Sequence, residues 1–388
     1  MSIRTDYYHL WDLLSEEERL IQQMVHEFVD QQVLPIIGDY FMKGEFPTEL
    51  IQPMAELGFF GATLPPEYGG QGISYTAYGL IMQELERGDS GVRSFVSVQS
   101  SLAMNSIFRF GSEEQKKKYL PKMARGELIG CFGLTEPDAG SDPGAMKTRA
   151  IPDGDSWILK GTKLWITNGD LADLAIVWAR DHEGKVRGFI VEKGTPGFSA
   201  NPVKGKLSLR ASDTAELVLE EARVPKENML PGAYKLAHAL TPLTQARYSI
   251  AWGAVGAAMA CYEEALDYAK ERIAFGKPIA AFQLTQQRLV DMLTGLTNAQ
   301  LLAYHLGRLA DAGKMRHTHV SFAKRYNVRT ALEIAREARN ILGANGITIE
   351  YQSMRHAANL ESVDTYEGTY QIHTLIVGKD ITGLEAYA

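Results

Sequence analysis

Residues 156–168, SWILKGTKLWITN, decide the fold, because a helical pattern gives way to strands in this part of the chain. The run is rich in aromatic, β-branched and other apolar side chains, which is typical of strands. Similar runs follow at 171–180, 186–194 and 214–225, separated by Gly, Asp and Pro. No stretch of helical periodicity lies between them, so we expect an antiparallel sheet or barrel rather than parallel βαβ units. No GxGxxG motif follows a strand here to indicate a Rossmann unit.

Helical patterns lie on both sides of these strands. Ser15 and Glu18 form a capping box before apolar residues at helical spacing, and Pro35 is expected to end that helix. Helical runs are predicted at 47–58, 74–87, 92–110 and 113–125, and, after Pro242, at 243–275, 281–313 and 319–343. We therefore expect an α+β multidomain chain: an N-terminal all-α domain at 1–128, a middle antiparallel β-barrel-like domain at 129–236, and a C-terminal four-helix bundle at 237–388.

Composition limits the classes of function. The 388 residues carry a formal net charge of −7, whereas nucleic-acid-binding domains are usually basic. Cys131 and Cys261 are far apart and belong to no Cys/His cluster, so neither a disulfide framework nor a metal site is indicated. No signal segment and no apolar run long enough to span a membrane is present, so we expect a cytoplasmic protein with no membrane span and no nucleic-acid partner.

A single acid, Glu367, stands in a glycine-flanked break between two apolar helical runs in LESVDTYEGTYQIHTLIVGKDITG, residues 360–383. One interpretation is structural: an acid near a helix N-terminus is stabilised by the helix dipole. The other is catalytic, since a lone carboxylate in a dry pocket can act as a base with a raised pKa. The sequence pattern alone favours the structural interpretation.

Arg93 is the second residue that the pattern singles out. It precedes a largely apolar helical run, and Ser97 lies on the same helix face. Because a buried, unpaired guanidinium is costly, Arg93 should face an anion. That anion is either Glu86, seven residues earlier on the chain, or a group of the substrate.

Five motifs occur in a characteristic order: CFGLTEPDAGSD at 131–142, KGTKLWITNG at 160–169, ERIAFGKPIAAFQ at 271–283, ARNILGANGI at 338–347 and YEGTYQIH at 366–373. Each alone has an ordinary explanation, such as a turn-rich loop, a core strand with Trp165 buried, or a glycine helix cap. Together, and over essentially the whole chain, they resemble the acyl-CoA dehydrogenase family. The resemblance implies an enzyme with FAD as cofactor, a homotetramer built as a pair of dimers, and electron transfer flavoprotein as electron acceptor.

The resemblance also implies which residues contact FAD. Phe132, Leu134, Thr135, Gly140 and Ser141 would lie along the flavin and the thioester, and Trp165, Ile166 and Thr167 against the isoalloxazine. Arg272 and Gln283, otherwise a solvated cation and a helix-start amide, would bind the pyrophosphate and adenosine. The segment at 338–347 would reach the FAD of a neighbouring subunit. The remaining cofactor contacts implied are Phe275, Asn340, Leu342, Gly343, Ala344, Thr369 and Gln371.

In this family a base removes the α-proton of an acyl-CoA while a hydride leaves Cβ for the flavin. The resemblance assigns the base to Glu367, because the position used by other members, immediately before Arg247, is Ala246 here. Gly368 would give the thioester room to approach. The substrate contacts implied are Arg93, Ser94, Ser97, Ser141, Leu243, Arg247, Tyr248, Tyr366, Gly368 and Tyr387.

Within the family, the segment around Arg93 and the C-terminal motif are most similar to the glutaryl-CoA dehydrogenases. There the matching arginine binds the distal carboxylate of the acyl chain, and Tyr366 matches the decarboxylating type, which gives crotonyl-CoA and CO2. The alternatives are a glutaryl-CoA dehydrogenase that does not decarboxylate, a dehydrogenase or oxidase of monocarboxylic acyl-CoA, and a non-catalytic, DNA-associated relative. The negative net charge and the absence of a basic C-terminal patch disfavour the last.

Overall fold

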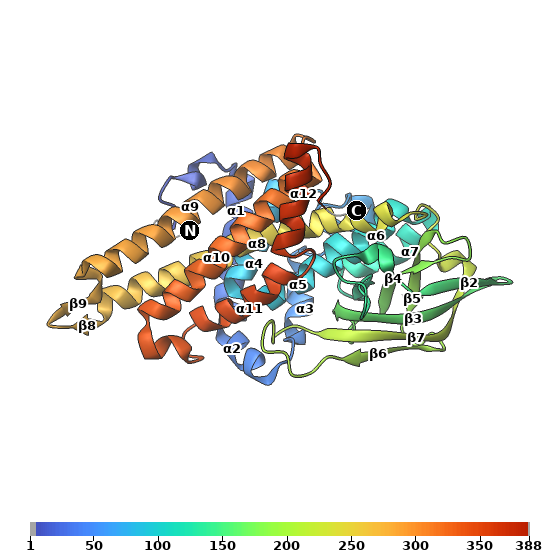
Figure 1. Ribbon diagram of the computed structural model, residues 1–388, viewed down its shortest axis with the longest axis horizontal. Helices are drawn as coiled ribbons and strands as arrows, with labels where there is room; N and C mark the ends of the chain where they lie inside the picture. The colour runs from blue at the N-terminus through green and yellow to red at the C-terminus, as the bar shows by residue number, and fades with distance from the viewer. Residues whose placement is uncertain (1–4, 387–388) are drawn as a thin grey trace.

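The computed structural model describes residues 5–386 and consists of helices packed against a curled β-sheet (Figure 1). The sheet lies at one end of the molecule and the long C-terminal helices extend toward the other. The predicted order of an all-α part, a β part and a second all-α part is confirmed. The domain limits at residues 128 and 236 stay a prediction. The N-terminal helices are α1 (Glu16–Phe28), α2 (Leu34–Lys43), α3 (Ile51–Glu56), α4 (Tyr75–Gly88), α5 (Ser90–Ser97), α6 (Asn105–Phe110) and α7 (Glu113–Ala124).

The first helix begins as predicted but does not end where predicted. Ser15 caps α1: its hydroxyl accepts the amide N–H of Glu18, and the Glu18 carboxylate accepts that of Ser15 at 2.8 Å. The prediction that Pro35 ends this helix is wrong, because the chain stays helical through a π-helical turn, η2 (Val29–Val33), and into α2. Pro35 lies in the first turn of α2, where a residue without an N–H donor is tolerated.

The middle part of the chain forms one seven-stranded sheet. Its strands are β1 (Gly130–Gly133), β2 (Arg149–Asp153), β3 (Ser156–Thr167), β4 (Leu174–Arg180), β5 (Val186–Glu192), β6 (Phe198–Pro202) and β7 (Thr214–Pro225). Their order is β1-β4-β2-β3-β7-β6, with β5 paired to β4. Most neighbours are antiparallel, as predicted, but β1 runs parallel to β4, and β2 meets β4 in one parallel pair. The prediction missed these pairs because a whole hairpin, β2–β3, separates β1 from β4 in the sequence.

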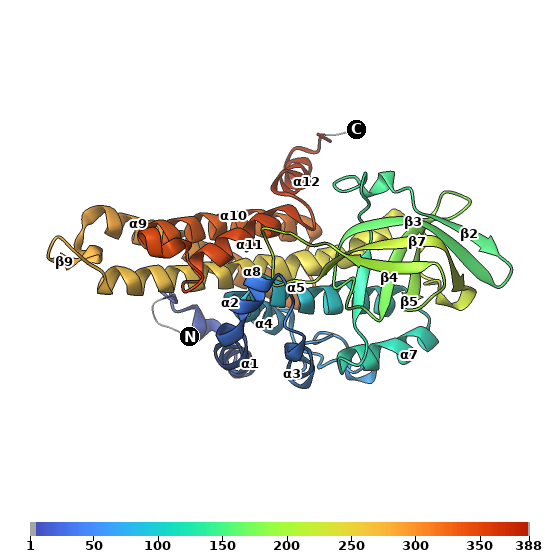
Figure 2. The same cartoon turned by 90° about the horizontal axis from the view of Figure 1, so that it is seen from below.

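The C-terminal helices are α8 (Leu236–Glu271), α9 (Gln283–Asp311), α10 (His317–Ile341), α11 (Ser353–Thr365) and α12 (Tyr370–Thr382). Helix α8 begins earlier than the predicted start after Pro242, and this proline lies inside it. Figure 2 shows that α8 runs from the sheet to the opposite end of the molecule, where a small hairpin, β8 (Ile273–Ala274) and β9 (Lys277–Pro278), follows it. Helix α8 packs against α4, α9 and α10, so the N-terminal and C-terminal helices share one core.

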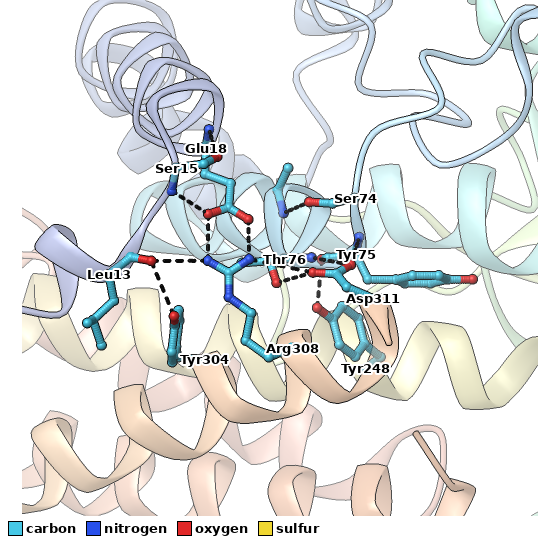
Figure 3. Close-up of polar contacts among 11 residues, drawn as sticks. Leu13, Ser15, Glu18, Ser74, Tyr75, Thr76, Tyr248, Tyr304, Arg308 and Asp311 are labelled. Carbon is cyan, nitrogen blue, oxygen red and sulfur yellow. Dashed lines mark hydrogen bonds and ion pairs between the residues drawn. The ribbon is translucent and has the colours of Figure 1, made fainter. Parts of the chain in front are cut away.

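A polar network holds three helices together at the end of α9 (Figure 3). The two terminal nitrogens of Arg308 donate to the two carboxylate oxygens of Glu18, at 2.6 and 2.7 Å. Asp311 accepts from the backbone amide of Tyr75 and the hydroxyl of Thr76, each at 2.6 Å. These contacts connect α1 and α4 to α9. Within residues 5–386, no helix is both long and apolar enough to cross a membrane.

The contact between α4 and α8 depends on glycine. A Cβ added to Gly256 would lie 1.8 Å from the carbonyl oxygen of Gln83 in α4, and one added to Gly253 would lie 2.0 Å from the Glu86 carboxylate. The first distance is impossible without a shift of one helix, and the second would require the buried Glu86 carboxylate to move. The backbones of the two helices can therefore approach this closely because α8 carries glycine at position 256, and Gly253 leaves room for the Glu86 side chain.

We expect Gly256→Ala to lower the free energy of unfolding by about 1 to 3 kcal/mol, the usual cost of overpacking a rigid core contact. Urea unfolding followed by circular dichroism measures this change. Gly378→Ala is the matched control, since that glycine lies in α12 and its added Cβ would meet nothing within 4 Å. The control should be more stable by roughly 0.5 to 1 kcal/mol, owing to helix propensity alone. Similar changes in the two variants would mean that α4 and α8 adjust freely.

Candidate active site

A cavity of about 660 Å³ lies where the three parts of the chain meet. This volume is typical of ligand-binding sites. Its wall combines residues from α5 and the π-helical turn after it, η5 (Val98–Met104), from β1 and the loop after it, from β3, from the loop before β7, and from α8, α11 and α12. Among its lining residues are most of those assigned above to the flavin and the reacting thioester: Ser94, Phe132, Leu134, Thr135, Gly140, Ser141, Trp165, Ile166, Thr167, Leu243, Arg247, Tyr366, Glu367, Gly368 and Thr369.

The wall made by β1 and β3 contains a bulge. The pairing of β3 with β7 shifts between Lys163 and Ile166, and Trp165 between them has a φ of 63°. As a result, Trp165 is 59% exposed and lines the cavity, which contradicts the simple explanation of a buried core residue. The buried ammonium of Lys163 donates to the carbonyl oxygen of Leu134 at 3.0 Å and to the Glu136 carboxylate at 2.8 Å. These bonds fix the loop after β1 against β3, so an exposed aromatic ring and a polar loop edge face the same space.

Glu367 lies in the break between α11 and α12, with the left-handed backbone conformation that side chains seldom adopt (φ 51°). The next residue, Gly368, also has a positive φ, 98°. Contacts from two helices hold this backbone. The Arg247 guanidinium of α8 donates to the carbonyl oxygen of Glu367 at 2.6 Å, and the Lys324 ammonium of α10 donates to those of Gly368, at 2.6 Å, and Tyr366.

The structural interpretation of Glu367 does not fit its surroundings. The N-cap of α12 is Thr369, whose hydroxyl accepts the amide of Ile372 at 3.2 Å, so Glu367 lies outside the first turn of that helix. Its Oε2 atom is buried and has no hydrogen-bond partner in the described part of the chain. Burial raises the pKa of the Glu367 carboxyl, while Lys324, Arg93 and Arg247 act in the opposite direction. A buried carboxylate with no hydrogen bond to Oε2 is a stronger base than one in water.

Arg93 is buried behind the cavity wall, with 1% of its surface exposed. Its Nε donates to the Glu86 carboxylate at 2.6 Å, and Nη2 donates to the Tyr366 hydroxyl. The Ser94 hydroxyl lies 3.3 Å from that of Tyr366, and both Ser94 and Tyr366 line the cavity. Glu86, one of the two anions considered above, therefore does pair with Arg93.

Several predicted substrate contacts, and the predicted FAD contact Gln371, lie away from the cavity. Ser97 is buried and its hydroxyl lies 2.7 Å from that of Ser249. Tyr248 is buried on the far side of α8 and donates to the carbonyl oxygen of Tyr75 at 2.6 Å (Figure 3). Gln371 is exposed on α12 and is not among the lining residues. Tyr387 lies outside the described residues.

The other predicted FAD contacts lie at the opposite end of the molecule from the sheet, around the β8–β9 hairpin (Figure 1). Arg272, Phe275 and Gln283 belong to this hairpin and its flanks, and Phe275 is 96% exposed. Asn340, Leu342, Gly343 and Ala344 end α10 close by, since Asn345 donates to the Tyr268 hydroxyl at 3.1 Å, one helical turn before Arg272. The Leu342 side chain is buried. None of these residues lines the cavity of its own chain.

The sequence interpretation missed Lys324 and Lys206. Lys324 has 1% of its surface exposed and lies on the buried face of α10 with Val320 and Ala331, so a lysine within an apolar stripe was the available signal. Lys206 lines the cavity, and its ammonium donates to the Ser212 carbonyl and the Thr214 hydroxyl, each at 2.7 Å. It lies in an irregular loop, which carries no comparable signal. Among the described residues, no group of His, Cys, Asp and Glu side chains could hold a metal ion.

Comparison with known proteins agrees with this architecture. Models of the N-terminal, middle and C-terminal domains of acyl-CoA dehydrogenase match residues 15–127, 131–222 and 236–382. The mitochondrial short-chain specific acyl-CoA dehydrogenase of Bos taurus is 36% identical, over 94% of this chain and 90% of that protein. A crystal structure of glutaryl-CoA dehydrogenase from Mycobacterium smegmatis is 54% identical, with a TM-score of 0.97 over 99% of both chains. A second one, in complex with FADH2, is 49% identical, with a TM-score of 0.98 over the full length of both. The chain therefore belongs to the acyl-CoA dehydrogenase family of oxidoreductases.

Proposed function

We propose that this acyl-CoA dehydrogenase oxidises glutaryl-CoA at the Cα–Cβ bond and that the glutaconyl-CoA formed loses CO2 to give crotonyl-CoA. The observation that carries the proposal is Arg93, a buried guanidinium placed behind Ser94 and Tyr366 at the wall of the cavity. A fixed cation at this place suits an acyl chain that ends in a carboxylate. The similarity to two glutaryl-CoA dehydrogenase structures over the whole chain supports it.

FAD is the cofactor of this family, and when bound it supplies the acceptor for the hydride that leaves Cβ. The cavity residues fit such a group. The exposed Trp165 ring offers a face to a planar heterocycle, and the hydroxyls of Thr135, Ser141 and Thr167 offer hydrogen bonds to its edge. The loop that carries Thr135 is held against β3 by the backbone bond from Leu164 to the Thr135 carbonyl, at 2.9 Å.

Glu367 is the proposed base for the α-proton. Glu367 lines the cavity, and Ala246, at the alternative position, has no group that could take a proton. After oxidation, the same carboxyl holds the abstracted proton. Loss of CO2 leaves a dienolate delocalised into the thioester, and return of that proton to it gives crotonyl-CoA.

Mass analysis of the products from glutaryl-CoA tests the proposal directly. Crotonyl-CoA with one CO2 for each glutaryl-CoA consumed is the expected result, and the flavin absorbance should bleach under anaerobic conditions. Release of glutaconyl-CoA alone would indicate the type that does not decarboxylate. Rapid bleaching by butyryl-CoA without any by glutaryl-CoA would overturn the proposed substrate.

Tyr366→Phe should change the ratio of the two products. The Tyr366 hydroxyl connects Arg93 and Ser94, so its removal takes a hydrogen bond from the guanidinium while leaving Glu367 and the ring in place. We expect flavin reduction to continue and the share of glutaconyl-CoA among the products to rise several-fold. Ser97→Ala is the matched control, because that hydroxyl bonds to Ser249 away from the cavity. An unchanged product ratio in Tyr366→Phe would remove this tyrosine from the decarboxylation step.

A monocarboxylic short-chain substrate is the second candidate. The observation in its favour is the bond from Arg93 to Glu86, at 2.6 Å, which balances the guanidinium within the protein. With that pairing, the charge of Arg93 does not by itself require a substrate carboxylate. The comparison of glutaryl-CoA with butyryl-CoA in Arg93 variants decides between the two candidates.

We further propose a homotetramer built as a pair of dimers, with electron transfer flavoprotein as the acceptor, in the cytoplasm. Exposed apolar side chains at the far end of the molecule support an assembly there, among them Phe275 at 96%, Leu284 at 73% and Val290 at 61%. In a tetramer the predicted contacts of the β8–β9 hairpin and of residues 338–347 would reach the FAD of another subunit. Light scattering should give four times the chain mass of 42.9 kDa, about 172 kDa. Reduction of purified electron transfer flavoprotein in the presence of substrate tests the acceptor.

A further inference from the structure

Three successive backbone carbonyls around Glu367 are held by only two cationic side chains. Lys324 donates to the carbonyl oxygens of Tyr366 and Gly368, on either side of the acid, and Arg247 donates to the carbonyl of Glu367 itself. Lys324 comes from α10, whereas the break that it holds lies between α11 and α12. The two contacts of Lys324 thus fix the backbone on both sides of a residue in an unfavourable conformation.

The ammonium of Lys324 has no carboxylate in hydrogen-bonding contact within the described residues, because both of its bonds go to carbonyl oxygens. It is nevertheless buried, with 1% of its surface exposed, and a buried cation needs a negative charge nearby. Burial lowers the pKa of Lys324, and Glu367 is the largest charge that opposes this. The charge of the lysine is therefore matched mainly by the acid whose backbone it holds.

We propose that Lys324 is a positioning residue for Glu367: it fixes the backbone of the break so that the carboxylate faces the cavity, and its charge favours the ionised carboxylate. The proposal rests on the proposed role of Glu367 as the base. Without Lys324, the acid would keep its burial and lose both a backbone anchor and a counter-charge.

Other titratable and charged groups surround the pair formed by Glu367 and Lys324 or its immediate neighbours. They are Arg93 of α5, Arg247 of α8, Asp364 of α11, Tyr78 and Glu86 of α4, Tyr366 in the break and His373 of α12. The ring nitrogens of His373 have no hydrogen-bond partner in the described part of the chain, and burial lowers the pKa of that imidazole to about 2, so it stays neutral. Lys324 is distinct among the cations because it touches the backbone on both sides of Glu367.

Two substitutions separate the two effects of the lysine. Lys324→Met keeps an unbranched side chain one atom shorter and removes both the charge and the donors. Lys324→Gln removes the charge and keeps an amide that can donate to the carbonyl oxygens. Arg325→Met is the matched control, since this neighbouring cation of α10 contacts α12 through Thr374 and Tyr370 but not the backbone of the break.

The readout is the rate of flavin reduction in single-turnover experiments as a function of pH, with the affinity for substrate measured separately. In Lys324→Met we expect the rate at pH 7 to fall by about 100-fold, with the acid limb of the profile moved at least one unit toward higher pH. Lys324→Gln should recover part of the rate and keep the displaced limb. Arg325→Met should match the wild type in both. A crystal structure of Lys324→Met should show the backbone at 366–368 displaced.

Unchanged pH profiles in both Lys324 variants would overturn the proposal. If Lys324→Met does not bind FAD, the position of the acid limb in the pH profile of Lys324→Gln decides whether the proposal holds. The measurement uses whichever thioester, glutaryl-CoA or butyryl-CoA, reduces the flavin of the wild-type enzyme. The result for Lys324 can therefore be interpreted even if glutaryl-CoA is not the substrate. An active Glu367→Gln variant would instead show that Glu367 is not the base, which is the assignment on which the inference rests.

Discussion

Glu367→Gln should abolish reduction of the flavin by acyl-CoA while FAD remains bound. The amide has nearly the shape of the carboxylate but cannot take the α-proton, and loss of a general base typically costs up to about 10⁴-fold in rate. The variant should keep the fold, because Oε2 of Glu367 makes no hydrogen bond to any described residue and the backbone contacts of Arg247 and Lys324 do not involve the side chain. Bleaching of the flavin in a stopped-flow spectrophotometer measures the rate, and its absorbance spectrum reports the bound cofactor.

The same prediction has a pH dependence. The base must be ionised, and burial raises the pKa of Glu367, so the wild-type rate should increase as the pH rises through a midpoint above that of an ordinary glutamate. Asp380→Asn serves as the control, since this exposed acid of α12 pairs with Arg316 at 3.1 Å and lies outside the cavity. A Gln variant that retains a tenth of the wild-type rate would show that another group is the base.

The sequence predicts the helices and strands of this protein well where the signal is local. The strand run at 156–168 became β3, and the runs at 74–87 and 113–125 became α4 and α7 within a residue or so. The error in the sheet concerns contacts between distant segments. The parallel pairing of β1 with β4 depends on neighbours that no window of sequence contains, whereas the prediction for Pro35 is wrong because a proline also suits the first turn of a new helix.

The candidate site shows the same division between features with a local sequence signal and features that depend on contacts between distant segments. The motifs around Thr135, Thr167 and Glu367 meet in one cavity, although no periodicity connects them. The exposure of Trp165 depends on a bulge in β3, and the contact of Lys324 with the break depends on how α10 packs against α11 and α12. Burial of a lysine can be predicted from its place in an apolar helix stripe, but its partner cannot.

The Glu86–Arg93 pair determines how the choice of substrate must be tested. Arg93→Ala alone would leave the Glu86 carboxylate buried beside only the Ser90 hydroxyl, at 2.8 Å, and breaking a buried pair costs about 3 to 5 kcal/mol of stability. Loss of activity in that variant would therefore mix a folding effect with a binding effect. The double variant Glu86→Gln with Arg93→Met removes both charges and avoids the unpaired acid.

In the double variant, kcat/KM for glutaryl-CoA should fall by roughly 10³-fold, because the distal carboxylate would enter a wall that no longer holds a cation to pair with it. The value for butyryl-CoA should change by less than about tenfold, since that chain ends in a methyl group and needs no charge opposite it. Glu86→Gln alone is the matched control, because it removes the acid and keeps Arg93, whose Nε can still donate to the amide oxygen of the glutamine. Equal losses for the two substrates would mean that Arg93 has a structural role in the cavity wall and does not bind the distal carboxylate. A monocarboxylic acyl-CoA would then be the better candidate substrate.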